Sequence, residues 1–150
     1  MRIVLQRVKE ASVKIDTKIA GSIRAGLLIY LGIEDEDNQN DIDWLIKKIT
    51  QMRIFSDEEG KMNLNVNEVE GEILVVSQFT LYASTKKGNR PSFTNAAKPE
   101  FARKLYEDFI ASMKEVYHGN IQTGRFGANM QVASINDGPL TFWLDSKEKN

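Results

Sequence analysis

The sequence predicts a mixed α/β domain, because segments with the pattern of strands alternate with segments with the pattern of helices. Two apolar runs, 26–33, which is bounded by glycines, and 73–76, which is preceded by Gly71, are typical of buried strands. Two other segments, 42–52 and 99–117, repeat apolar residues every three or four positions, as a helix with one buried face does. A chain of 150 residues suits a single domain, and we expect residues 1–150 to form one.

The first third of the chain predicts three consecutive strands. Residues 2–15 begin with alternating apolar and polar positions, and 16–18 have the composition of a turn. Residues 19–24 then form a short return strand, and the apolar run 26–33 forms the third. We expect these strands to lie side by side.

An acidic stretch at 34–43 precedes the first predicted helix. As a calcium loop counted from Asp35, it would need glycine at the sixth position and glutamate at the twelfth, but Asn40 and Ile46 stand there. We interpret it as a solvated loop whose negative charge favours the first turn of the helix. Asn38 or Asn40 can cap that helix.

The middle of the chain contains an alternating segment at 62–66, typical of an edge strand, and a loop at 83–95. This loop carries three cations beside a glycine, namely Lys86, Lys87 and Arg90. They could hold phosphates. A solvated connection explains them equally well.

The second helix begins at Pro99, a residue favoured in a first turn, and ends at His118-Gly119, where the glycine favours a left-handed cap. Three strands separated by turns are predicted to close the chain, at 121–126, 130–135 and 140–144. The last five residues, 146–150, are polar, and we expect them to be frayed.

Polar residues follow the buried strand 71–76 at once, in the segment Ser77-Gln78-Phe79-Thr80-Leu81-Tyr82. If the strand continued, Ser77 would share one face with Phe79, and Thr80 would lie on the other. Such polar groups either bond neighbouring strands or line a pocket at the end of the strand.

The inventory of reactive side chains is small. Cysteine is absent, which excludes disulfides and thiolate chemistry, and His118 is the only histidine. We expect no metal and no cofactor, and a triad built on His118 is not favoured, because that residue ends a helix. Two sources of catalysis remain. One is the positioning of the substrate, and the other is backbone amides that stabilise a developing oxyanion.

The formal net charge of −1 indicates no broad nucleic-acid surface, so we expect any RNA contact to be local, and no DNA partner. No apolar run approaches the roughly 20 residues that span a bilayer, and no signal-peptide pattern is visible. We therefore expect a cytoplasmic protein without a membrane partner.

Gly138-Pro139 joins two of the closing segments. A tight turn with a trans bond is the default for such a pair, because only roughly 5–6% of X-Pro bonds in folded proteins are cis. A cis bond would instead present both carbonyl oxygens side by side, where they could bind an ammonium group.

These motifs together resemble the D-aminoacyl-tRNA deacylases. The resemblance rests on Ser77–Tyr82 and Gly138-Pro139, supported by residues 1–8, 88–93 and 123–130, and it runs from Met1 to about Ser146. It implies a homodimer of α/β subunits, each with two packed, barrel-like sheets and two main helices on one side.

The resemblance also implies residue roles. Gly138-Pro139, in cis form, would enter the pocket of the other subunit and hold the amino group of a D-residue or glycine, while an L side chain would meet backbone. Arg7 would orient this dipeptide. Phe126, Met130 and Tyr82 would help to bind the substrate, which is a D-aminoacyl-tRNA, or a glycyl-tRNA mischarged on tRNA-Ala.

For the reaction, the ribose 2′-hydroxyl would help to activate water while backbone amides near Phe79 and Thr80 stabilise the oxyanion. Ser77 and Gln78 would shape the site. Thr80 as a covalent nucleophile is the rival mechanism. Two alternative functions are a non-catalytic RNA-binding module and a small-molecule esterase that uses Thr80.

Overall fold

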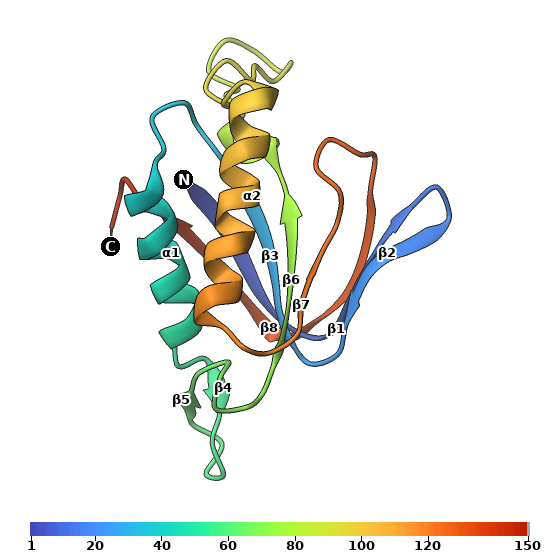
Figure 1. Cartoon of the computed structure of the whole chain (residues 1–150), viewed down its shortest axis with the longest axis vertical. Coiled ribbons are helices and arrows are strands. Elements are labelled where there is room, and N and C mark those ends of the chain that lie inside the picture. Colours follow the sequence, from blue (N-terminus) through green and yellow to red (C-terminus); the bar gives the residue numbers. More distant parts are fainter. Residues whose placement is uncertain (150) are drawn as a thin grey trace.

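The computed structural model describes residues 1–149. Its elements in chain order are β1 (Arg2–Ile15), β2 (Lys18–Ile23), β3 (Gly26–Gly32), α1 (Gln39–Gln51), β4 (Phe55–Ser56), β5 (Met62–Leu64), β6 (Glu72–Ser77), the 3₁₀ helix η1 (Phe79–Tyr82), α2 (Pro99–Val116), β7 (Ile121–Thr123) and β8 (Gln131–Asp145). Both α-helices lie on the same side of the main sheet (Figure 1). The predicted α/β class is confirmed.

The long strand β1 organises the main sheet. Six strands form this sheet. Five of them follow the order β2-β1-β3-β6-β7, and the sixth, β8, pairs with the remaining edge of β1. The first half of β1 pairs with β3 and its second half with β2, so the sheet bends where β1 changes partner. The expected two packed layers are therefore two parts of one bent, barrel-like sheet, and β4 and β5 form a small second sheet.

Close packing of β2 over β7 nearly closes this barrel. A Cβ at Gly21 of β2 would stand only 2.6 Å from the carbonyl oxygen of Thr123 in β7. Because no larger residue fits there without displacing backbone, the glycine permits this approach.

Strand β6 lies between β3 and β7, parallel to both, and its apolar residues are buried on both faces, as predicted. Ile73 and Val75 belong to the apolar core beneath the two helices, whereas Leu74 and Val76 belong to a second core inside the bend of the sheet. The end of this strand is therefore held firmly by packing on both sides.

The two helices confirm the predicted periodicity. Asn38 caps α1 through a capping box, one of the two caps expected, and Pro99 begins α2. The expected left-handed cap at Gly119 is wrong, because this glycine does not adopt a positive φ. A Cβ there would stand 2.6 Å from the ring of Tyr117, so close packing explains the small residue.

The chain after β8 differs from the expected frayed tail. Ser146 is buried, accepts a hydrogen bond from the Met1 ammonium at 2.8 Å and donates one to Asp41 at 2.6 Å. Lys147 forms an ion pair with Asp41 at 3.0 Å. Burial opposes ionisation of Asp41, but the bonds from Ser146, the Asn38 N–H and Lys147 outweigh it, so its pKa lies below the ordinary value. Asn150 lies outside the described residues.

The closing strands also differ from the prediction. The segments 130–135 and 140–144 belong to one strand, β8, because both pair with β1, and the sequence between them bulges out of the ladder. Strand β7 ends at Thr123, three residues before the expected end. No helix among residues 1–149 is long and apolar enough to cross a membrane.

Candidate functional site

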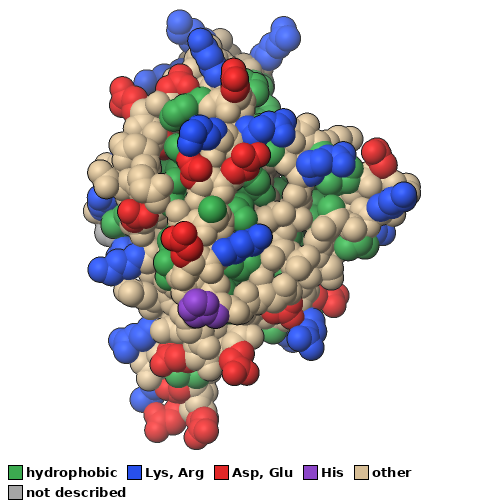
Figure 2. All heavy atoms as spheres, viewed as in Figure 1, with side chains coloured by type: hydrophobic (Ala, Val, Ile, Leu, Met, Phe, Trp, Pro, Cys, Tyr) green, Lys and Arg blue, Asp and Glu red, His purple; other side chains and the backbone are tan. Residues whose placement is uncertain are grey.

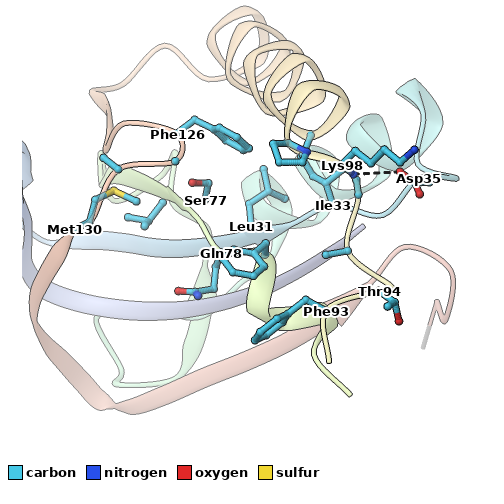
Figure 3. A pocket seen from close by; sticks show the side chains of 18 of the residues that line it. Leu31, Ile33, Asp35, Ser77, Gln78, Phe93, Thr94, Lys98, Phe126 and Met130 are labelled. Atoms are coloured by element: carbon cyan, nitrogen blue, oxygen red, sulfur yellow. Dashed lines mark hydrogen bonds between the residues drawn. The ribbon is translucent and has the colours of Figure 1, made fainter. Parts of the chain in front are cut away.

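A cavity of about 720 Å³ opens at the ends of the parallel strands β3 and β6. Its walls come from the end of β6, the first turn of α2 and two loops that carry Phe93 and Phe126 (Figure 3). The lining is mostly apolar, with Ser77 and Gln78 as polar groups near the strand end. Such a pocket at the carboxyl ends of parallel strands is where ligands bind in many α/β proteins.

The segment Ser77–Tyr82 does not continue β6, so the predicted alternation of its side chains is wrong. The strand ends at Ser77, the Gln78 N–H donates to the carbonyl oxygen of Leu31 at 2.7 Å, and the chain then turns into η1. Ser77, Gln78 and Phe79 consequently line the cavity together, although alternation would have separated them.

The turn into η1 leaves two backbone donors free. Among the hydrogen bonds of the described residues, none uses the N–H groups of Phe79 and Thr80. The first N–H groups of a helix have no partner within it, and they attract negative charge.

Thr80 lies beside the cavity rather than in its lining. Its side chain is exposed, and its hydroxyl accepts a hydrogen bond from the Gln78 amide. His118, the only imidazole, follows the far end of α2, an 18-residue helix about 27 Å long at 1.5 Å per residue. No basic imidazole therefore stands near Thr80.

Tyr82 lies away from the cavity. The side chain is 3% exposed, and its hydroxyl has no hydrogen-bond partner among the described residues. The Arg2 guanidinium lies 4.3 Å from the ring centroid. Burial raises the pKa of Tyr82 above its ordinary value. The 3₁₀ turn directs this residue inward, so it does not line the cavity as the sequence led us to expect.

Gly138-Pro139 lies in the bulge of β8, and its peptide bond is cis. Arg7 holds the bulge: its Nε donates to the Asp137 carbonyl oxygen at 3.2 Å, and its Nη1 donates to the Ile54 carbonyl oxygen at 2.7 Å. Gly138 has a φ of 132°, and a Cβ there would stand 3.2 Å from Arg7 Nη2. Both residues of the dipeptide are exposed, and neither lines the cavity of its own chain.

Phe126 and Met130 both line the cavity, on the loop between β7 and β8. The ring of Phe126 packs against Tyr106 of α2, with centroids 5.7 Å apart, and the Arg103 guanidinium lies 5.1 Å from its centroid. Figure 3 shows Phe126 beside α2 at the edge of the pocket. The loop is thereby attached to the helix.

Lys86, Lys87 and Arg90 lie on an exposed loop closed by a bridge between Ser84 and Ser92. Among the described residues, none of the three cations takes part in an ion pair. Figure 2 shows several basic side chains at this end of the molecule and mainly acidic ones at the opposite end. None of the three lines the cavity.

Sequence reasoning missed several lining residues, among them Phe93, Lys98 and Asp35. The start of α2 at Pro99 was visible in the sequence, but nothing there indicated that this turn would face β6. Within residues 1–149, no group of three histidine, cysteine or acidic side chains is arranged to hold a metal.

Comparisons with known proteins agree with this architecture. The family described as D-Tyr-tRNA(Tyr) deacylase matches residues 4–145. Relatives named D-aminoacyl-tRNA deacylase include one from Cytophaga hutchinsonii, 60% identical over 97% of both chains, and one from Flavobacterium johnsoniae, 54% identical over 99% of both.

Two solved structures share the fold. One, named c-Myc DNA Unwinding Element Binding Protein, has a TM-score of 0.92 and 40% identity over 97% of this chain and 98% of its own. A probable eukaryotic D-amino acid tRNA deacylase has a TM-score of 0.81 at 17% identity, over 95% of this chain and 97% of its own. The family match covers nearly the whole chain, and this chain belongs to the D-Tyr-tRNA(Tyr) deacylase family.

Proposed function

We propose that this protein hydrolyses the ester bond that joins a D-amino acid to the terminal ribose of tRNA. The observation that carries the proposal is the pair of free N–H groups of Phe79 and Thr80 at the edge of the cavity, in a chain whose relatives bear this activity in their names. Two such donors can stabilise the oxyanion that forms when water attacks an ester.

Water is the attacking group in this proposal, and the 2′-hydroxyl of the substrate ribose helps to activate it. Thr80 is a poor nucleophile here, because its hydroxyl is bonded to the Gln78 amide, which is no base. Ser77 and Gln78 line the cavity and would bond the ester and ribose.

Selection of D-aminoacyl esters over L-aminoacyl esters requires a group that the pocket of a single chain lacks. We propose that a second copy supplies Gly138-Pro139, whose carbonyl oxygens bind the ammonium group of the substrate. In support, the dipeptide is exposed, outside its own cavity and fixed by Arg7. An L side chain would then collide with backbone, whereas a D side chain or the hydrogen of glycine would fit.

Exposed apolar side chains are available for contacts in this dimer. Phe79, Ile135 and Trp143 are between 48% and 57% exposed, and Ile135 and Trp143 belong to β8, the strand that carries the dipeptide. Burial of such side chains between subunits is favourable by about 25 cal/mol per Å² of apolar area. Light scattering should show a dimer.

The test of the activity compares D-tyrosyl-tRNA with L-tyrosyl-tRNA, and glycyl-tRNA-Ala with L-alanyl-tRNA-Ala. We expect turnover of the D-ester and the glycyl ester only, and sharply reduced turnover when the terminal ribose lacks its 2′-hydroxyl. Equal cleavage of both tyrosyl esters would contradict the proposal. A side-chain esterase that uses Thr80 would be insensitive to the 2′-hydroxyl.

The crossing of the dipeptide between subunits is tested by mixing two variants that each have reduced activity, Gly138→Ala and Gln78→Ala. A mixed dimer contains one site with an intact pocket and an intact dipeptide, so activity should rise after mixing. If each chain supplied its own dipeptide, the activity of the mixture would not exceed that of the separate variants.

One structural relative is named for binding to a DNA element. Multiple turnovers of charged tRNA in the presence of excess duplex DNA would distinguish the proposed enzyme from a nucleic-acid-binding module. A pure binding module would release no amino acid.

A further inference from the structure

The cavity has a basic rim that the residues assigned above do not include. Arg103 lies on the outer surface of the second turn of α2, directly after Ala102, which lines the cavity. Its guanidinium covers the ring of Phe126 at 5.1 Å from the centroid, and Phe126 itself forms part of the cavity wall. Arg125 precedes this phenylalanine and is exposed. Two arginines thus flank one wall residue.

Neither arginine is neutralised by a carboxylate within the described residues. Glu100 and Glu107 stand three residues before and four after Arg103 on α2, the spacing of helical ion pairs, but neither comes within 4.0 Å of it. The next residue, Lys104, does pair along the helix, with Asp108 at 2.9 Å. Arg103 is instead turned toward Phe126, where the aromatic ring leaves its N–H groups available.

The backbone beside this rim is also open. Gly127 lines the cavity and has a φ of 76°, a conformation that favours glycine. The nearest atom to a Cβ placed there would be Arg103 Nη2, at 3.9 Å. No side chain therefore separates the guanidinium from a ligand that leaves the cavity past this glycine.

A guanidinium stacked on a ring is well suited to bind phosphate. Its planar fork can donate two parallel hydrogen bonds to phosphate oxygens, and stacking restricts the side chain before binding. In a protein with a net charge of −1, an unpaired Arg103 in contact with the wall residue Phe126 and an exposed, unpaired Arg125 next to it in the chain form a local rather than a general attraction for nucleic acid.

We propose that Arg103 and Arg125 bind backbone phosphates of the last nucleotides of the tRNA 3′ strand and guide the terminal ribose into the cavity. The proposal rests on the proposed function and adds a binding surface to it. It is separate from the contacts predicted for Lys86, Lys87 and Arg90, which lie on another loop and outside the cavity lining.

The test compares Arg103→Gln, Arg125→Gln and the double variant with the unmodified protein, on D-tyrosyl-tRNA and on 3′-O-D-tyrosyl-adenosine, which has no phosphate. We expect KM for the tRNA to rise about tenfold in the double variant at nearly constant kcat, since the contacts are equal in ground and transition states. The slope of log(kcat/KM) against log[salt] should shrink by about 0.7 for each lost contact to a single strand. Hydrolysis of the adenosine ester should not change.

Two controls separate binding from a structural effect. Lys114→Gln removes the same charge from the last turn of α2, away from the cavity, and should change neither slope nor KM. Arg103→Lys keeps the positive charge but lacks the planar guanidinium. Its salt slope should equal that of the unmodified protein. An unchanged KM and slope in the double variant, or equal losses on both substrates, would overturn the proposal.

Affinity for uncharged tRNA, measured by fluorescence anisotropy, tests the arginines without any catalysis. The double variant should bind more weakly and with a smaller salt slope, and unchanged binding would overturn the proposal. If the unmodified protein bound tRNA through these arginines but hydrolysed no D-ester, the proposed function would fail and the binding surface would stand.

Discussion

The two motifs of the candidate site, Ser77–Tyr82 and Asp137–Pro139, are fixed in opposite ways. The first follows a strand buried on both faces, and its polar groups open into a cavity formed by the same chain. The second bulges from an exposed strand, is held by hydrogen bonds of the Arg7 and Asn136 side chains, and lines no cavity of its own chain. The comparison shows one motif fixed by packing within the chain and a second that the same chain holds out to solvent.

This difference has a physical basis. Packing on both faces of β6 fixes the end of this strand. Bonds from the Gln78 N–H to the Leu31 carbonyl oxygen at 2.7 Å and from Arg2 Nη1 to the Leu81 carbonyl oxygen at 3.1 Å then fix the turn into η1. The Gly138-Pro139 dipeptide is exposed, so hydrogen bonds hold the bulge instead, from Arg7 to two carbonyl oxygens and from the Leu140 N–H to the Asn136 side chain at 3.0 Å. Substitutions that remove a single contact should therefore disturb the conformation of Asp137–Pro139 more than that of Ser77–Tyr82.

The largest effect is expected for Gly138→Ala. The new Cβ would stand 3.2 Å from Arg7 Nη2 at a φ of 132°, so the dipeptide must shift. We expect kcat/KM to fall on the order of 100-fold, since misplacing a positioning group by 1 Å can cost that much. Gly60→Ala is the matched control, because Gly60 also has a positive φ but no atom within 4 Å of the new Cβ. Equal activity losses in both variants would refute a specific role for Gly138.

Arg7→Lys should have the next largest effect. A lysine cannot reproduce the two bonds from Nε to Asp137 and from Nη1 to Ile54, so the bulge should become mobile. We expect kcat/KM for the D-ester to fall about tenfold, as loss of one charge-assisted hydrogen bond implies. The ratio of kcat/KM for the D-ester to kcat/KM for the L-ester should fall as well. Arg24→Lys is the control. The Arg24 side chain is 93% exposed, so this variant should keep both kcat/KM for the D-ester and the preference for the D-ester.

A smaller effect, on stability, should distinguish two buried tyrosines, Tyr82 at the end of the first motif and Tyr106 on α2. Tyr106 donates to the Val75 carbonyl oxygen at 3.2 Å, and burial raises the pKa of Tyr106 to about 12. Tyr106→Phe should lower the free energy of unfolding by about 1 kcal/mol, the usual value of a buried hydrogen bond. The Tyr82 hydroxyl has no partner within residues 1–149, so Tyr82→Phe should not lower it. Denaturant titration measures both free energies of unfolding, and an equal loss in both variants would contradict the distinction.

The smallest effect is expected for Thr80→Ala. The backbone N–H of this residue remains after the substitution, and only a bond from the Gln78 amide is lost. We expect single-turnover hydrolysis within about threefold of the unmodified rate, far from the loss that removal of a nucleophile causes. Loss of activity with an intact circular dichroism spectrum would instead make Thr80 the nucleophile.

Local patterns were sufficient for elements whose burial follows their own periodicity. The helices, the three opening strands and the buried strand β6 could be predicted in this way, and the motifs Ser77–Tyr82 and Gly138-Pro139 could be recognised by resemblance. A residue's place on a helix or strand depends on neighbours a few positions away, and the sequence contains that information directly.

Contacts distant in sequence decided the rest. β8 is one strand because both of its halves pair with β1, and Ser146 is buried because the Met1 ammonium lies beside it. The turn of η1 depends on the bond from Gln78 to Leu31, and Arg103 reaches Phe126 only where α2 meets the loop after β7. The sequence by itself determined which segments are helices and strands and which residues could do chemistry. Only the tertiary structure decided which of them meet, because pairing free energy depends on partners that local periodicity does not identify.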